Sequence, residues 1–230
     1  MHKTWIMLVA GTAIMATATG LWAQEENPDH RLRAAADVLQ EMLGAPDKGI
    51  PRDLLEKAQC VIIIPGVKKA GFIVGADYGK GFSMCRHSGG WTGPAPVTMG
   101  GGSFGAQIGV ESTDLVMLVM DRRGMEKLAS DKFTLGADAS VAAGPVGRTT
   151  KADTDASLHA EILAWSRARG AFAGIALDGA VLKKDPGETR RLYGHEVGEH
   201  AILYGDVPSP AAASALTNIL DRYPKERASR

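Results

Sequence analysis

The sequence predicts an α+β fold, in which a curved or barrel-like, mostly antiparallel sheet is packed against helices from the N- and C-terminal segments. Glycine is abundant, at 28 of 230 residues, while aromatic residues make up only 6% of the chain. Short apolar runs separated by glycine-containing turns fill the middle of the chain, which is typical of a sheet with tight turns. Amphipathic segments lie near both ends, so the order of elements does not follow an alternating βαβ pattern.

The composition indicates a folded globular protein. Hydrophobic residues make up 45% and charged residues 23%, and the 26 basic side chains balance the 26 acidic ones. This apolar fraction excludes a disordered chain, and its distribution excludes a polytopic membrane protein. The absence of a basic excess argues against nucleic acid as a partner.

The first 23 residues have the pattern of a secretory signal peptide. Lys3 supplies the positive charge, an apolar stretch follows, and Ala23 precedes Gln24 at a plausible cleavage site. The alternative is an uncleaved N-terminal anchor. We therefore expect an exported protein, periplasmic or secreted, that can lie at the periphery of a membrane, with residues 24–230 forming a single domain.

Helical spacing of apolar residues predicts a first helix over residues 29–43, with Asp29 as its N-cap and Gly44 as its stop. Further helices are predicted over residues 51–58, 123–130 and 210–223.

The segments between these helices are predicted to be mostly extended. Residues 60–64 form an apolar β-branched run that we expect to end at Pro65-Gly66. The other expected segments are 71–78 and 81–87, joined as a hairpin by Gly79-Lys80; 91–99, an edge strand or loop; 102–110 and 114–120, joined through 111–113; 135–144; and 158–167 with 171–177, joined through 168–170. Residues 158–167 also fit a helix.

Two cysteines, Cys60 and Cys85, lie in strand-like runs of the part expected to be exported. An oxidising compartment permits a disulfide between them, and two buried free thiols are the alternative. The spacing alone does not decide between the two. Two cysteines are too few for a metal site of their own.

No pattern predicts catalysis, a cofactor or a metal site. Residues 100–105 match GxGxxG, but an apparent strand follows where a dinucleotide site requires a helix. His195 and His200 are five residues apart, whereas a zinc-binding helix needs a spacing of four. We read these as a glycine kink and a polar turn that enters a helix, and we expect no enzyme.

The first predicted helix has two interpretations. Arg31 and Arg33 lie beside its apolar stripe, so the helix could lie in a membrane interface with its cations near lipid phosphates. Lys68 and Lys69 add a second local pair of cations. A core-packed helix with a solvated polar face is the alternative.

Several blocks, taken in order, resemble the SYLF lipid-binding domain. They cover residues 58–72 (AQCVIIIPGVKKAGF), 78–81 (YGKG), 91–96 (WTGPAP), 105–109 (GAQIG), 136–140 (GADAS), 144–148 (GPVGR), 166–174 (SRARGAFAG) and 193–194 (YG). The resemblance implies phospholipid binding, since eukaryotic members bind phosphoinositides and are similar to proteins that bundle actin at membranes. It also implies membrane contact through the N-terminal helical part, which corresponds to residues 29–43.

We therefore expect a non-catalytic protein that binds anionic, phosphoinositide-type phospholipid at membrane surfaces. The expected lipid-contact residues are Arg31, Leu32, Arg33, Leu39, Leu43, Lys68 and Lys69. Export would separate the protein from actin, so actin is not expected as a partner. The alternative function is a structural or protein-interaction module of the cell envelope without a lipid ligand.

Overall fold

A computed structural model describes residues 27–45, 49–71, 74–88, 90–104, 109–146, 160–168, 170–175 and 177–224. The expected signal peptide at residues 1–23 lies outside this range. The helices are α1 (Pro28–Gly44), α2 (Arg52–Lys57), α3 (Arg122–Leu128), α5 (Pro186–Tyr193), α6 (Glu199–Tyr204), the 3-10 helix η1 (Ala211–Ala213) and α7 (Ser214–Leu220). The strands are β1 (Cys60–Gly71), β2 (Val74–His87), β3 (Gly90–Trp91), β4 (Ala95–Phe104), β5 (Gly109–Val119), β6 (Lys132–Thr134), β7 (Val141–Ala143), β8 (Ile162–Ala168), β9 (Ala171–Gly174) and β10 (Val181–Lys184).

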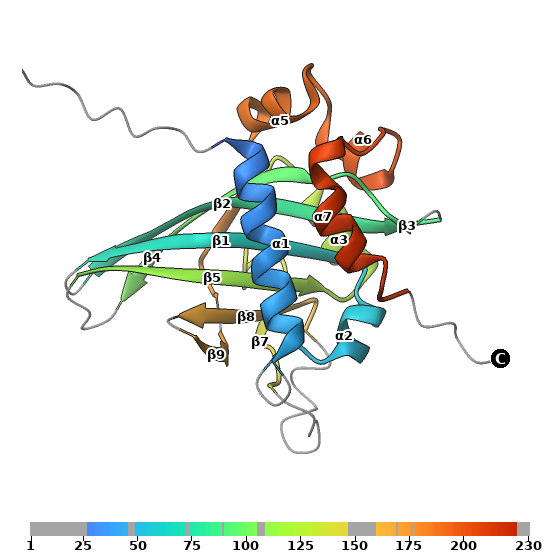
Figure 1. The fold of residues 1–230 in the computed structure, drawn as a ribbon. Helices are drawn as coiled ribbons and strands as arrows, with labels where there is room; N and C mark the ends of the chain where they lie inside the picture. The colour runs from blue at the N-terminus through green and yellow to red at the C-terminus, as the bar shows by residue number, and fades with distance from the viewer. Residues whose placement is uncertain are drawn as a thin grey trace, which may run out of the picture.

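Within the described residues, the strands form one strongly curled sheet (Figure 1) in the order β6-β10-β4-β2-β1-β5-β8-β7. β3 pairs with β2 and β9 pairs with β8. Neighbours are antiparallel except β7 and β8, which are parallel. The predicted α+β fold with a curved, mostly antiparallel sheet is therefore confirmed.

β1 lies at the centre of the sheet and is buried on both faces. Val61 and Ile63 pack into one apolar cluster with α1, α2 and α7, whereas Ile62 and Ile64 pack into a second cluster with α3 and α6. A strand covered on both faces needs a continuous apolar run, which explains the sequence of residues 60–64. We call the side of the sheet that contacts α1, where Val61, Ile63 and Phe82 point, the α1 face.

The predicted helices and one predicted hairpin are confirmed, with small shifts at their ends. α1, α2 and α3 lie where the helical spacing placed them, and residues 210–223 form η1 and α7. The prediction that Asp29 caps α1 is wrong, because Asn27 is the N-cap and accepts a hydrogen bond from the Asp29 amide, so that the helix begins at Pro28. β8 and β9 pair as predicted, which excludes a helix over 162–168.

The prediction that the first strand ends at Pro65-Gly66 is wrong, because β1 passes through these residues in a bulge. The pairing register shifts between Ile64 and Val67 on the β5 side. Gly66 has a φ of 62°, and its amide donates a 2.8 Å hydrogen bond to the Asp114 carboxylate. An inserted residue reverses the alternation of side chains. Val67 therefore lies in the same cluster as Ile64, and Lys68 points to the α1 face.

The predicted hairpin at Gly79-Lys80 is also wrong, since β2 is one continuous strand. Gly79 and Gly81 allow β2 to approach β1 closely. A Cβ atom on Gly79 would lie 2.7 Å from the Ile64 side chain, and one on Gly81 would lie 2.0 Å from the Ile63 carbonyl oxygen. Glycine is typical both of a tight turn and of a strand that packs closely against its neighbour, so the sequence alone does not distinguish the two.

Three further strand predictions need correction. Residues 135–144 are not extended throughout, because 136–138 form a turn and the strand β7 is limited to Val141–Ala143. Residues 95–104 form an interior strand between β2 and β10, not an edge strand or loop. Pro96 is tolerated because it lies just beyond the residues of β4 that pair with β10, which begin at Val97. Residues 111–113 are not a turn, because β5 runs from Gly109 through them. β6, β10 and α5 were not predicted, whereas α6 is the helix that the polar turn at residues 195–200 was expected to enter.

We predict that Gly81→Ala destabilises the fold by about 3 kcal/mol or more, because the new methyl group would collide with the backbone of β1. Urea unfolding measures the effect. Gly44→Ala is the matched control, since a Cβ atom there meets nothing within 4 Å, and we expect it to leave stability unchanged or raise it by up to about 1 kcal/mol. Equal stability of the two variants would contradict this explanation of the β1–β2 approach.

Candidate functional site

The three leucines expected to enter a membrane are core residues in this structure. Leu32, Leu39 and Leu43 point from α1 into the cluster on the α1 face, and Leu39 is 0% exposed. α1 packs across β1 and β2 and beside α7, as Figure 1 shows. The expectation of a membrane-facing apolar stripe on this helix is therefore corrected to the alternative, a core-packed helix with a solvated polar face.

Arg31 is also held inside the protein. Its guanidinium pairs with the Glu188 carboxylate on α5, and both side chains are buried. Lys80 adds a 2.9 Å ion pair to Asp185 at the start of α5. Burial acts to raise the pKa of Asp185, but hydrogen bonds from Lys80 and from the Glu188 amide outweigh it and lower that pKa. This charge cluster fixes the N-terminal part of α1 to α5, so Arg31 serves the fold.

We predict that Leu39→Ala lowers the free energy of unfolding by about 2–5 kcal/mol, as expected for a fully buried leucine. Thermal or urea unfolding measures it. Arg33→Gln is the control on the same helix, because Arg33 is exposed, and its change should stay within about 0.5 kcal/mol. A Leu39→Ala protein as stable as the control would show that α1 is not docked in solution.

Lys68 and Lys69 do not act as a pair, because they point to opposite faces of β1. Lys69 is half-buried on the face away from α1. Lys68 is exposed and lies directly opposite Tyr78 of β2 and Ser112 of β5. No ion pair to Lys68 occurs within the described ranges.

Tyr78 is an exposed aromatic side chain that the sequence analysis did not single out. It is 52% exposed, and the other exposed large hydrophobic side chain of the described chain is Val146. Directly paired residues of antiparallel strands share a face, so Tyr78 and Lys68 stand side by side. We call this pair the Lys68–Tyr78 surface. Lys68 is near the end of β1 and Tyr78 is in the first half of β2. These parts of the two strands extend past α1 toward the left of Figure 1.

Glu199 is a buried carboxyl group that the sequence analysis also missed. It begins α6, is 7% exposed, and neither oxygen has a hydrogen-bond partner among the described residues. Burial raises its pKa to about 8, with Lys184 lowering it and Asp131 raising it by smaller amounts. Within the polar segment 195–200, nothing in the sequence marks this one side chain as buried.

The raised pKa predicts that stability falls with pH. An unfolded glutamate loses its proton near pH 4.5, whereas the folded protein keeps it until about pH 8. The stabilisation is therefore complete below about pH 4.5 and is lost progressively as the pH rises to about 8. Glu199→Gln should remove this decline in urea unfolding measured across that range. Parallel pH profiles for the two proteins would contradict the assignment.

The motifs considered for nucleotide or metal binding form no site in the described chain. Gly100 to Ser103 are strand residues paired with β2, and residues 105–108 lie outside the described range. His195 lies in the turn before α6, where its Nδ1 is 2.9 Å from the Tyr193 carbonyl oxygen. No group of three or more potential metal ligands occurs among the residues that the structure describes.

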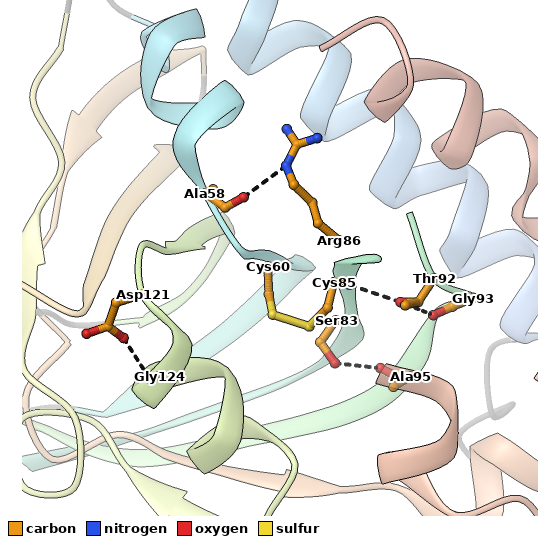
Figure 2. The surroundings of a disulfide bond; sticks show 10 residues. All are labelled: Ala58, Cys60, Ser83, Cys85, Arg86, Thr92, Gly93, Ala95, Asp121 and Gly124. Atoms are coloured by element: carbon orange, nitrogen blue, oxygen red, sulfur yellow. Dashed lines mark hydrogen bonds between the residues drawn. A yellow bond between two sulfur atoms is a disulfide. The ribbon is translucent and has the colours of Figure 1, made fainter. Parts of the chain in front are cut away.

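Cys60 and Cys85 form a disulfide between directly opposite positions of β1 and β2 (Figure 2). Next to it, the Arg86 guanidinium donates to the carbonyl oxygens of Ala58, Leu55 and Tyr223 at 2.8–2.9 Å. The same group lies 4.2 Å from the centre of the Trp91 ring. The disulfide therefore joins β1 to β2 covalently, and the hydrogen bonds of Arg86 connect this end of the sheet to α2 and to the segment that follows α7.

None of the described helices is both long enough and apolar enough to cross a bilayer.

Comparison with known proteins identifies relatives along most of the chain. Residues 100–223 match the family described as "Ysc84: Las17-binding protein actin regulator". The chain is 34% identical over 198 residues to SH3 domain-containing YSC84-like protein 1 of Homo sapiens and of Rattus norvegicus, an alignment that covers 83% of this chain and 58% of each relative. It is 34% identical over 199 residues to Protein YSC84 of Saccharomyces cerevisiae, covering 82% of this chain and 42% of that protein. The chain thus spans little more than half the length of the two mammalian relatives and less than half the length of the yeast protein.

Proposed function

The chain belongs to the Ysc84 family, the SYLF-domain family that its sequence resembles, and from that premise we propose that it binds anionic phospholipid at a membrane surface without catalysing a reaction. The bound lipid would be of the anionic, phosphoinositide type. The protein would lie on the surface and not cross it. The Lys68–Tyr78 surface is the contact that we assign to the bilayer.

The observation that carries this proposal is the exposed pairing of a cation with an aromatic side chain. Lys68 has no carboxylate partner among the described residues, and Tyr78 beside it is 52% exposed. Tyrosine suits a membrane interface because its ring is apolar and its hydroxyl is polar. The ammonium group can meet a lipid phosphate while the ring enters the headgroup layer.

The expected binding is weak and sensitive to salt. Each cation near an anionic surface contributes about 1 kcal/mol, and salt screens this contribution. Arg33 is exposed on α1 and can add a further cation. The apolar side chains of α1 contribute nothing while they remain in the core, so the polar outer surface has to supply the affinity.

The proposal includes export, to a periplasm or to the outside of the cell. Residues 1–23 have the pattern of a secretory signal. The Cys60–Cys85 disulfide supports this location, because disulfides persist in oxidising compartments.

A second candidate function is protein binding. The matching family is described as binding Las17 and regulating actin, and its match covers residues 100–223, which include the second half of β4 and every element from β5 to α7. This observation favours a protein-interaction module that has no lipid ligand. Co-sedimentation with lipid distinguishes the two candidates.

We predict that the full chain co-sediments with vesicles of phosphatidylglycerol and phosphatidylcholine but not with phosphatidylcholine alone, and that added salt releases it. Lys68→Gln should weaken binding about fivefold, the equivalent of about 1 kcal/mol. Tyr78→Ser should weaken it through loss of the ring.

Arg52→Gln is the matched control, because Arg52 is an exposed cation on α2, away from the Lys68–Tyr78 surface. This variant should bind the anionic vesicles as the wild type does. Equal binding to neutral and anionic vesicles, or no binding to either, would refute the proposed function. Loss of binding in the control as well as in Lys68→Gln would refute the assigned surface.

A further inference from the structure

Two lysines face each other on neighbouring strands at one end of the sheet. Lys132 of β6 and Lys183 of β10 are directly opposite in the antiparallel pairing, and both are exposed. The Cβ atoms of such a pair lie about 4.5–5.5 Å apart, and like charges in this position destabilise a sheet. The pair therefore needs an explanation other than the stability of the isolated protein.

The neighbouring carboxylates are engaged elsewhere. Asp185, two residues after Lys183, binds Lys80 at 2.9 Å, accepts a hydrogen bond from Thr98, and accepts another from the Glu188 amide. Asp131, next to Lys132, pairs with Lys184 at 2.9 Å. Neither lysine of the pair has an ion-pair partner in the part of the chain that the structure describes.

Alternation along the strands directs both lysines outward. Phe133 and Leu182 are directly opposite each other and are buried in the cluster with α3 and α6. Lys132 and Lys183 point to the other side. The same row continues through Thr98 of β4 to Lys80 of β2, so lysines occupy three of its four positions.

We propose that the Lys132–Lys183 pair binds a phosphate group, with one ammonium donor from each strand. A phosphate monoester carries close to two negative charges, so one such group between the side chains would turn their repulsion into attraction. The proposed function supplies one source, a lipid headgroup, and free phosphate is the other. The chemistry of the site is the same for both.

The adjoining depression is not assigned to the phosphate. It has a volume of about 530 Å³ and is bordered by Arg123, Lys127 and Lys132, but Glu126 and Asp138 also line it. Lys127 is paired with Glu161 at 3.2 Å. The carboxylates make this depression less favourable for an anion than the outward face of the lysine pair.

The test combines thermal unfolding with vesicle binding, using the full chain and the variants Lys183→Gln and Lys132→Gln. Without phosphate, each variant should unfold about 1–3 °C higher than the wild type, because the repulsion is removed. Inorganic phosphate, compared with chloride at equal ionic strength, should raise the midpoint of the wild type and not that of the variants. Lys183→Arg should retain the response, and Arg52→Gln is the control.

Vesicles of phosphatidic acid and phosphatidylcholine identify the source of the phosphate. Weaker binding by the variants, by about fivefold, would support a lipid headgroup. Variants that lose the response to inorganic phosphate but bind vesicles as the wild type does would support free phosphate as the ligand. A wild type that binds no vesicles but responds to inorganic phosphate through these lysines would refute the proposed function and support this site.

The inference is overturned if both variants unfold at a lower temperature than the wild type, because the lysines would then stabilise the fold. It is also overturned if the variants match the wild type both in their response to phosphate and in vesicle binding. Two separate single variants are used so that a folding failure in one leaves the other to decide.

Discussion

The docking of α1 on the sheet is the interaction on which the rest of the structure depends. Leu32 and Leu39 are almost fully buried against β1 and β2, and Arg31 fixes the start of the helix to Glu188 on α5. A helix that supplies one wall of the core cannot offer the same side chains to a bilayer. Any membrane contact of the folded protein therefore has to use side chains that the core leaves outside, which directs attention to exposed lysines and to Tyr78.

The bulge in β1 decides which of those lysines is outside. Up to Ile64, even-numbered residues of β1 point away from α1, and the extra residue near Gly66 reverses this order. Lys68 consequently shares a face with Tyr78, whereas Lys69 points to the other side and is half-buried. The bulge, where the Gly66 amide donates a hydrogen bond to Asp114, thus sets the direction of the side chains that follow it in the strand.

The sequence predicted α1, its boundaries and the overall fold class well, because helical spacing and glycine-rich turns are local signals. It did not predict what covers the apolar stripe of α1, since a core face and a membrane-inserting face require the same leucines. Gly79-Lys80 appeared to be a turn because glycine also serves close strand packing, here against Ile64 and Val67. The burial of Glu199, the exposure of Tyr78 and the pairing of Lys132 with Lys183 depend on contacts between distant segments, which no local pattern contains.

The central claim is that the protein meets membranes with α1 still docked. Amide hydrogen exchange of the full chain, with and without phosphatidylglycerol vesicles, tests it most directly. The account predicts that amides of residues 28–44 keep their protection on the vesicles, because the helix stays in the core, while protection increases around Lys68 and Tyr78. Loss of protection across residues 28–44 on anionic vesicles would show that the helix leaves the sheet to enter the bilayer, and would contradict the account.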